Sequence, residues 1–453
     1  MLSTLPRLQK RVIPSTTEPP NQGGYYRGSE NEGAMKPICD WLEGLDDVFV
    51  VVKTGANEAL EKLPAHFRTT LSCIPHYGIW SDLEEDIAGH HVSDALDEMD
   101  PNIVANHPDF EYYRQLREKG TGGFSSEQLT TWAEAQNTAS GRDTPGWKLD
   151  KWKFLPLAEK AYRQRPEARW FVLMECDTFV IWRNLLAWLS TLDSSQPLYL
   201  GHQMQIGDVV FAYGGAGIVI SNSAMRKLVE YYASNRAFYD DFTAHHWAGD
   251  CVLGKAMADA GVNLKWSWPT LLGDLIANVN FKSTFGSSSA RPWCYYATSY
   301  HHLTPSGVMQ YDSFEKTWRK ENPNKLLRHG DVFRHFVLPK LQTEIEDWDN
   351  ESTDEQHDAE SIRSPADCRR VCEGQPECVQ FSLKGQSCRT SKVIKLGHEH
   401  RHQRKEGKNP ISSSNGNEEK EEQRVMSGWL MDRVAAFVDE MDASCEGEDW
   451  LVT

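Results

Sequence analysis

Two acidic residues that flank a single cysteine form the first group of side chains in this sequence that could do chemistry. Glu175 and Asp177 follow the apolar run 170–174, which is short enough for a central strand. Ligands of open α/β sheets bind at the carboxyl ends of the strands, where these acids lie. Carboxylates there can hold a hard divalent cation beside a diphosphate. Taken alone, the triplet favours a helix N-cap or a solvated turn over a metal site.

Three further groups of residues could contribute to a site. Asp250 precedes an apolar stretch, and from the residues alone it favours a helix N-cap. His301 and His302 could offer imidazole nitrogens to a metal, although a histidine pair after a tyrosine is more often packed or solvated. Gly214 and Gly215 allow the backbone to approach a ligand closely, or they only turn the chain.

Lysines lie near two of the expected strands. Lys53 and Thr54 end the apolar run that begins at Asp47, where a first βα turn could meet a nucleotide. Lys148, Lys151 and Lys153 precede the helix that leads to the acidic triplet, and they could contact phosphate oxygens. A solvated charged face is the favoured interpretation of these three.

Length and composition limit what can position these residues. A chain of 453 residues exceeds one ordinary core, so we expect one large domain and at least one small unit. Lys and Arg number 48 against 65 Asp and Glu, a formal net charge of −17 with no basic stripe, which argues against a nucleic-acid partner. We find neither a run of about 20 apolar residues for a spanning helix nor a signal-peptide core.

The order of expected elements indicates an α/β fold. An apolar strand over 47–55 is followed by a helical stretch, a helix over 155–165 precedes the strand before the acids, and further strands cover 198–200 and 211–221. We expect a stem over residues 1–38, a large α/β domain over 39–341, an acidic linker over 342–359, a cysteine module over 360–397, a polar linker over 398–424 and an amphipathic helix within 425–453.

Four of the ten cysteines fall close together near the C-terminus. Cys368 and Cys372 lie on one face of a helix, and Cys378 and Cys388 follow around a strand. The spacing lacks the paired CxxC of a zinc site, so we favour two disulfides, for which three pairings remain open. Disulfides point to an oxidising compartment, where the sequon at Asn350 would be a glycosylation acceptor.

The stretch from Val48 to His302 resembles glycosyltransferase family 31, the fringe-like and core 1 β1,3-galactosyltransferase-like enzymes, especially of fungal type. The matching segments are 170–180, 213–221 and 249–254, of which the Gly-Gly-Ala-Gly run beginning at Gly214 is the most specific. Residues 360–397 resemble a PAN/apple-like module, which would bind protein or carbohydrate. The resemblance implies a GT-A-type nucleotide-sugar-binding fold followed by a small disulfide-bonded α+β module.

The family resemblance also implies roles for single residues. Asp177 and Glu175 would bind manganese with the diphosphate, His301 would supply an imidazole ligand, with His302 as the alternative, and Asp250 would be the catalytic base. Gly214 and Gly215 would belong to a loop that faces the acceptor or the nucleotide-sugar donor, and Lys53 and Thr54 would lie where the first βα turn meets the nucleotide. The sequence departs from the family pattern at Glu175, where the family has Asp, and at Gly249, where the family has Glu.

The activity that follows is metal-dependent, inverting transfer of a hexose or N-acetylhexosamine from a UDP-sugar to an acceptor hydroxyl, in β1,3 linkage, with a glycan or glycoprotein as acceptor. Manganese or another divalent cation would be the cofactor. The resemblance implies the Golgi or the secretory-pathway lumen, and we expect an N-terminal type II anchor that this sequence does not contain. The alternative hypotheses are a non-catalytic relative acting as a chaperone or carbohydrate-binding protein, and a surface interaction protein that works through its cysteine module.

Overall fold

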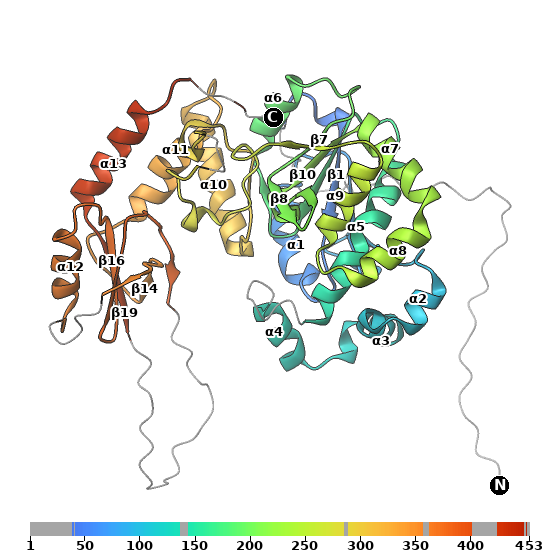
Figure 1. The fold of residues 1–453 in the computed structure, drawn as a ribbon, viewed down its shortest axis with the longest axis horizontal. Helices are drawn as coiled ribbons and strands as arrows, with labels where there is room; N and C mark the ends of the chain where they lie inside the picture. Colours follow the sequence, from blue (N-terminus) through green and yellow to red (C-terminus); the bar gives the residue numbers. More distant parts are fainter. Residues whose placement is uncertain are drawn as a thin grey trace, which may run out of the picture.

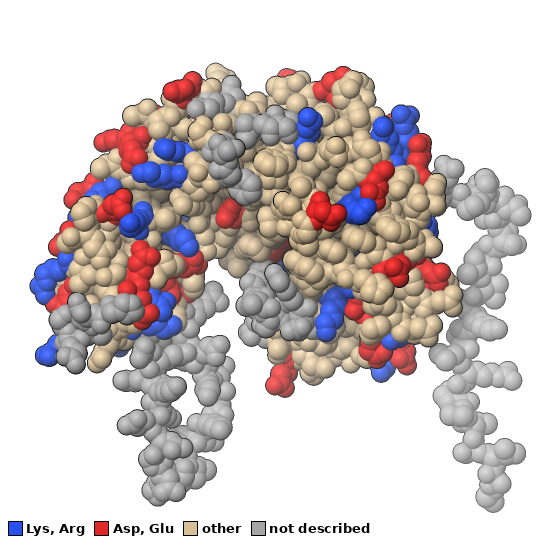
Figure 2. Space-filling view, viewed as in Figure 1, with Lys and Arg blue, Asp and Glu red and all other residues tan. Residues whose placement is uncertain are grey.

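The computed structural model describes residues 39, 41–135, 144–284, 289–356, 362–400, 424–447 and 450. The expected stem over 1–38 and most of the expected polar linker lie outside these residues. The described elements form two lobes, a larger one around a central sheet and a smaller one that carries the C-terminal strands and helices (Figure 1). Lys and Arg side chains are interspersed with Asp and Glu on the face shown in Figure 2.

An eight-stranded sheet forms the centre of the larger lobe and confirms the α/β prediction. β1 pairs in parallel with both β2 and β5, whereas β10 runs antiparallel between β5 and β7. The sequence-based strand before the acidic triplet is correct, since it is β5. In sheet order the strands are β11 (Leu264–Trp266), β7 (Tyr199–Gly201), β10 (Ile218–Ser221), β5 (Trp170–Glu175), β1 (Val48–Lys53), β2 (Tyr77–Ser81), β4 (His90–Asp94) and β3 (Glu85–Ile87).

Helices cover both faces of this sheet because its central strands are buried on both sides. In β1 the side chains of Phe49 and Val51 join one hydrophobic core, while Val48, Val50 and Val52 join another on the opposite face. The first core contains α5 (Pro145–Gln164), α7 (Asn222–Ser234), α8 (Arg236–His245) and α9 (Gly249–Asp259), and the second contains α1 (Ala59–Arg68) and α6 (Trp182–Ser190). On the first side also lie α2 (Pro101–Asn106), α3 (Glu111–Lys119) and α4 (Ser126–Ala135).

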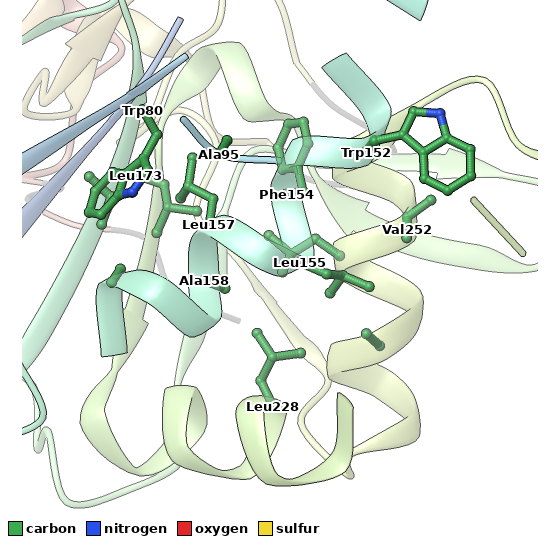
Figure 3. Packing of buried hydrophobic residues seen from close by; sticks show 14 of the residues in the cluster. Trp80, Ala95, Trp152, Phe154, Leu155, Leu157, Ala158, Leu173, Leu228 and Val252 are labelled. Atoms are coloured by element: carbon green, nitrogen blue, oxygen red, sulfur yellow. The ribbon is translucent and has the colours of Figure 1, made fainter. Parts of the chain in front are cut away.

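The helix α5 begins ten residues earlier than the sequence-based expectation of a helix over 155–165. Pro145 occupies its first turn, which suits a residue without an N–H, and the helix continues through Pro156 despite the lost hydrogen bond. Packing compensates for that loss. Figure 3 shows Phe154, Leu157 and their neighbours in α5 lying among Leu173 of β5 and Val252 of α9, and each such side chain contributes about 1.5–3 kcal/mol by burial.

The smaller lobe shares one hydrophobic core between residues 268–341 and the C-terminal module. Trp293 and Tyr311 pack in the same cluster as Trp429, Val434 and Met441. A two-stranded ribbon of β6 (Phe179–Val180) and β12 (Ser299–Tyr300) joins this lobe to the larger one. Its helices include α10 (Pro305–Glu321), α11 (His329–Val332) and the C-terminal α13 (Met431–Ala443), which confirms the expected amphipathic helix.

The expected acidic linker is wrong for the part of it that the structure describes. Residues 345–346 and 354–355 are edge strands of the module's five-stranded sheet, and their backbone hydrogen bonds explain why a polar stretch is ordered. The module also extends past residue 397, because β19 lies inside this sheet, between β13 and β16. Its order is β13 (Ile345–Glu346), β19 (Val425–Trp429), β16 (Gln380–Lys384), β17 (Ser387–Ser391) and β15 (Asp354–Glu355), with α12 (Pro365–Glu373) and the pair β14 (Trp348–Asp349) and β18 (His398–Glu399) beside it.

Four disulfides connect eight of the ten described cysteines, and Cys176 and Cys251 are free. Cys368 pairs with Cys388 and Cys372 with Cys378, so the preference for disulfides over zinc is confirmed and the open pairing is resolved. A third bond joins Cys39 to Cys73. The fourth, between Cys294 and Cys445, links the segment that follows α13 to the rest of the smaller lobe.

The glycosylation sequon lies inside the module. Asn350 has no exposed surface, and its Nδ2 donates to the carbonyl of Phe381 at 3.0 Å and lies 3.4 Å from that of Gly428. That nitrogen is the atom to which a glycan would be attached, so the expectation of a glycan here is wrong for the folded protein. None of the helices in the described part of the chain is both long and apolar enough to cross a bilayer.

Candidate active site

The ends of β1 and β5 bring the acidic triplet to one edge of the sheet. Lys53 and Glu175 are directly opposite each other in the register of the two strands, and Cys176 N donates to the carbonyl of Lys53 at 3.2 Å. The chain then turns at once, with Thr178 N donating to the carbonyl of Glu175 at 3.0 Å. The side chains of Glu175 and Asp177 therefore line the same pocket, at the carboxyl ends of the strands, as predicted.

Asp177, His301 and His302 form a cluster that could hold a metal ion. One ligand atom from each lies within 4.8 Å of the others. Asp177 and His301 are buried, and Nε2 of His301 lies 2.9 Å from Oδ1 of Asp177. The N-cap interpretation of the triplet is wrong, because the next helix begins only at Trp182 and its N-cap residue is Ile181.

The residues of this cluster fit a divalent cation. Nε2 of His301 is a buried polar atom without a hydrogen-bond partner among the described residues, because its short contact to Asp177 lacks hydrogen-bond geometry. Although burial opposes a charged ring, Asp177 and Glu175 raise the pKa of His301 to about 10. A cation between these groups would supply the positive charge that the carboxylates favour. The hydroxyl of Tyr213 lies 3.2 Å from Nδ1 of His301, which positions the ring from its far side.

Glu175 stands beside this cluster and is shared with Lys53. Its Oε2 lies 3.4 Å from Nε2 of His301, while its Oε1 lies 3.2 Å from Nζ of Lys53. Although burial opposes ionisation, Lys53 and His301 lower the pKa of Glu175 to about 2, so the group is anionic at neutral pH. The sequence predicted Glu175, Asp177 and His301 as metal ligands, whereas the cluster in the structure consists of Asp177, His301 and His302. Metal ligation by Glu175 therefore stays a prediction.

The Gly-Gly loop packs directly against the side chains of His301 and Glu175. A Cβ on Gly215 would lie 2.2 Å from Cε1 of His301, and a Cβ on Gly214 would lie 3.0 Å from Oε1 of Glu175. Both glycines are buried, and Gly217 has a φ of 85° that favours glycine. The loop therefore acts through close backbone approach to these side chains, and a direct contact of Gly214 or Gly215 with the donor stays a prediction.

Asp250 has the environment of a general base. Its carboxylate accepts from Gly214 N at 3.0 Å and from Cys251 N at 2.9 Å, and it faces the pocket from the first turn of α9. Burial, with a further contribution from the nearby charge of Glu175, raises the pKa of Asp250 to about 6. A carboxylate poised near neutrality can take a proton from a hydroxyl. The N-cap interpretation is wrong here too, since Ala248 is the N-cap residue of α9.

The glycine at 249 has a steric explanation. A Cβ at this position would lie 2.4 Å from the ring of Phe154 and 2.6 Å from Cα of Lys151. An acid at 249 therefore has no room against α5. This close packing of α9 on α5 accounts for the departure from the family's Glu.

Lys53 is held in the pocket by two carboxylates. Its Nζ lies 2.5 Å from Oδ1 of Asp150 and 4.8 Å from the ring centroid of Phe154. Burial opposes the charge, but Asp150 and Glu175 raise the pKa of Lys53, so it stays protonated. An ammonium group here can meet a phosphate oxygen, which agrees with the predicted position of Lys53.

Thr54 and the lysines of α5 differ from their sequence-based interpretations. Thr54 is buried beneath the pocket lining, with its hydroxyl 3.2 Å from Sγ of Cys176, so it supports the acidic triplet. Lys153 is buried and donates to the carbonyl of Thr54 at 2.8 Å. Lys151 pairs with Asp109 at 2.8 Å at the pocket wall. The prediction of a solvated, charged face is therefore correct only for Lys148, which is exposed.

Several pocket residues were missed by sequence reasoning. Trp147, Asp150 and Phe154 lie on one side of α5 at helical spacing and line the pocket together. This helical spacing could have identified the three residues from the sequence, but only if the helix had been predicted to begin at Pro145. Trp247, which the sequence alone could not assign to the core or to the site, also lines the pocket, two residues before α9 begins. Lys62 contacts Oδ2 of Asp177 at 3.2 Å and was not singled out either.

A known protein family matches the part of the chain that contains most of this site. The model of the Fringe-like family matches residues 43–268, which contain β1, the acidic triplet, the Gly-Gly loop and Asp250. Residues 43–268 are thus a Fringe-like domain, and His301 and His302 come from beyond it.

One curated relative is the glycoprotein-N-acetylgalactosamine 3-beta-galactosyltransferase 1 of Xenopus laevis, 31% identical over 116 residues. That match covers 25% of this chain and 31% of the relative, so the chain spans about a third of the relative's length. A crystal structure of the galactosyltransferase LgtC with donor and acceptor sugar analogs aligns with 59% of this chain and 95% of its own, at 11% identity and a TM-score of 0.31. The relative's name is that of a galactosyltransferase, and the likeness of this chain to it is confined to the matched 116 residues.

Proposed function

We propose that this protein is a metal-dependent, inverting glycosyltransferase that moves a hexose or N-acetylhexosamine from a UDP-sugar to an acceptor hydroxyl in β1,3 linkage. The observation that carries the proposal is one pocket holding the cluster of Asp177, His301 and His302 together with Asp250. The Fringe-like match supports the class of reaction. The name of the relative, a glycoprotein-N-acetylgalactosamine 3-beta-galactosyltransferase, supports the linkage and a glycan or glycoprotein acceptor.

Asp177 and His301 would hold the cation, with His302 or Glu175 completing the set. When bound, manganese or a similar divalent ion would neutralise the charge of the diphosphate and of the departing UDP. Asp177 is suited to this role because, although burial opposes it, His301 and Lys62 hold the pKa of its carboxyl well below the usual range. The ligand is therefore ionised at every physiological pH.

Asp250 takes the proton of the acceptor hydroxyl as that oxygen attacks the anomeric carbon of the donor. The amide of Gly214 fixes the carboxylate in place, and its raised pKa makes it a stronger base than an ordinary aspartate. Inversion needs one base and a direct displacement, and Asp250, which lines the pocket, is the residue that we assign as that base. Lys53, held by Asp150 and Glu175, keeps an ammonium group at the pocket wall for a phosphate oxygen.

Four disulfides support a secretory-pathway compartment such as the Golgi lumen, since such bonds persist in oxidising surroundings. The module of residues 342–400 and 424–447 adds a second surface there. Its role in binding a protein or carbohydrate, and its relation to PAN/apple modules, belong to the proposal.

Titration of UDP into the purified protein tests the proposal. We expect binding in manganese, loss of that binding in chelator, and loss in Asp177→Asn, which keeps the size of the side chain but removes its charge. Asp259→Asn is the matched control, because Asp259 pairs with Tyr239 and Lys255 away from the pocket. Transfer to a glycan, followed by analysis of the anomeric configuration, then tests inversion and linkage.

The alternative, a non-catalytic chaperone or carbohydrate-binding protein, gives a different result. A folded protein that fails to bind UDP at millimolar manganese overturns the proposal. Binding of UDP that is unchanged by chelator and by Asp177→Asn overturns the metal-dependent part of it.

A further inference from the structure

A row of nearly parallel aromatic rings leads from the pocket along α8. The ring of Trp147 stacks with that of Trp247 at 5.9 Å and 12°, and Trp247 stacks with His246 at 6.3 Å and 10°. His246 continues to Phe242 at 5.4 Å and 19°, and Phe242 to Phe238 at 6.2 Å and 17°. These separations are those of offset stacking, in which each ring leaves part of its face uncovered. We call these five residues the aromatic row.

Local structure explains how the row forms. Phe238 and Phe242 are four residues apart in α8, so they lie on one face of the helix. His246 and Trp247 follow in the connection to α9, and Trp147 enters from the first turn of α5. Helix α8 lies beside α5 and α9 in the larger lobe (Figure 1). Three separate segments thus contribute rings of similar orientation to one surface.

The row is unusual because it leaves large apolar side chains open to solvent. Phe238 is 53% exposed and Trp247 is 46% exposed. Neither side chain is a member of the buried hydrophobic core of this lobe, so core packing does not explain why these two large aromatic residues lie here. A connected aromatic surface that continues into a pocket is typical of a ligand-binding surface.

The position of Trp247 close to Asp250 indicates which ligand the aromatic row binds. Trp247 and Asp250 line the same pocket, and only Ala248 and Gly249 separate them. Asp250 is the base for the acceptor hydroxyl in the proposed reaction, and Trp147 and Trp247 line the same pocket, so the molecule that carries that hydroxyl can lie against their rings. Aromatic faces suit the apolar C–H faces of sugar rings, and the four steps of the row extend well beyond a single sugar ring.

We infer that the aromatic row is an acceptor subsite that binds an extended oligosaccharide, with its terminal sugar at Trp147 and Trp247 and further sugars toward Phe238. This rests on the proposed function for the direction of the chain and deepens it by assigning the substrate class. The enzyme extends a glycan of at least two sugars and discriminates against free monosaccharides.

The test compares binding and transfer in the full-length protein with two single variants, Trp247→Ala at the pocket and Phe238→Ala at the distant end. Trp266→Ala is the matched control, because Trp266 is similarly exposed at 42% but lies on the edge strand β11. The probes are an array of defined oligosaccharides with their component monosaccharides, followed by titration of the oligosaccharides that bind. Affinity for UDP with manganese is measured in parallel.

Wild type and Trp266→Ala should bind oligosaccharides more tightly than monosaccharides. Trp247→Ala should weaken glycan binding roughly tenfold without changing UDP affinity, since an aromatic contact contributes about 1 kcal/mol or more. Phe238→Ala should remove only the advantage of the longer glycans. Loss of UDP affinity in Trp247→Ala overturns the inference and assigns the row to the donor. Equal binding by all variants, or no oligosaccharide binding at all, overturns it as well.

The outcomes separate this inference from the proposed function. Metal-dependent UDP binding without any effect of the row leaves the transferase and removes the acceptor subsite. Glycan binding that depends on the row in a protein that fails to bind UDP contradicts the transferase and, with it, the acceptor role of the row.

Discussion

Gly215 lies so close to His301 that a Cβ at this glycine would be 2.2 Å from the imidazole Cε1. The glycine belongs to the loop between β9 (Val209–Ala212) and β10, which is preceded by β8 (Gln203–Ile206), while the histidine comes from the end of β12. The missing side chain at 215 is therefore what allows the ring to lie beside Asp177. The position of a candidate metal ligand depends on the absence of an atom in a distant segment.

Gly215→Ala should displace the ring of His301. We expect manganese-dependent UDP affinity to fall roughly 10–100-fold, as it does when the support of a ligand is lost. Titration of UDP in manganese measures the effect, and circular dichroism checks the fold. Gly122→Ala is the control, because a Cβ at Gly122 meets nothing within 4 Å. Unchanged affinity in Gly215→Ala would show that His301 takes no part in metal binding.

Asp250→Asn should abolish transfer and leave donor binding intact. The amide is similar in size but cannot accept a proton, so we expect kcat to fall by about 10²–10⁴. UDP affinity should change little, because the carboxylate is held by Gly214 N and Cys251 N and does not contact the metal cluster. A variant that retains wild-type kcat would exclude Asp250 as the base.

The raised pKa of Asp250 predicts how activity depends on pH. Because the pKa is about 6, the ionised base is lost as pH falls through that value. We expect kcat/KM to decline about tenfold per unit below it. The measurement is a profile of kcat/KM from pH 5 to 8. A flat profile across this range contradicts the assignment.

Ionisation of Asp250, which is needed for activity, should lower the stability of the folded protein. The folded-state pKa of Asp250 lies above the ordinary value of 3.8, so its contribution is present below that value and is lost as pH rises through about 6. Asp250→Asn should therefore gain up to about 2–3 kcal/mol of unfolding free energy relative to wild type across this window. Denaturant unfolding of both proteins at pH 4, 5 and 7 measures it. A constant difference between them would show that burial does not perturb this carboxyl.

Gly249→Ala should destabilise the protein by overpacking α9 against α5. The added methyl group overlaps the ring of Phe154, and such overlaps cost about 1–3 kcal/mol. In a Phe154→Ala background the cost should be smaller but not zero, because Cα of Lys151 remains close. Thermal unfolding of the four proteins in this cycle provides the coupling. Additive effects would show that Phe154 does not explain the glycine.

Removal of the disulfide between Cys294 and Cys445 should loosen the smaller lobe. This bond closes a loop of 151 residues, whereas that between Cys372 and Cys378 closes one of 6. Replacement of both cysteines of a pair by serine should cost about 2–5 kcal/mol for the long loop and less for the short one. Denaturant unfolding measures both, and limited proteolysis should show earlier cleavage near α13 in the first variant. Equal losses would contradict the dependence on loop length.

The sequence by itself determined those features of the protein that reside in a single segment. The apolar run before Glu175 specifies a buried strand, the acids that follow it lie at a strand end, and the helical spacing after Leu430 specifies α13. Each of these follows from the periodicity or the length of a local stretch. Four cysteines at tight spacing were enough to predict two disulfides near the C-terminus.

Only the tertiary structure decided which of these features meet. Lys53 faces Glu175 through strand register, Asp250 accepts from Gly214 across 36 residues, and His301 joins Asp177 from beyond the Fringe-like domain. Within the polar stretch, residues 345–346 and 354–355 become strands because they pair with β19 and β17, which come later in the chain. Such contacts depend on register and on packing between distant segments, and local spacing carries no information about either.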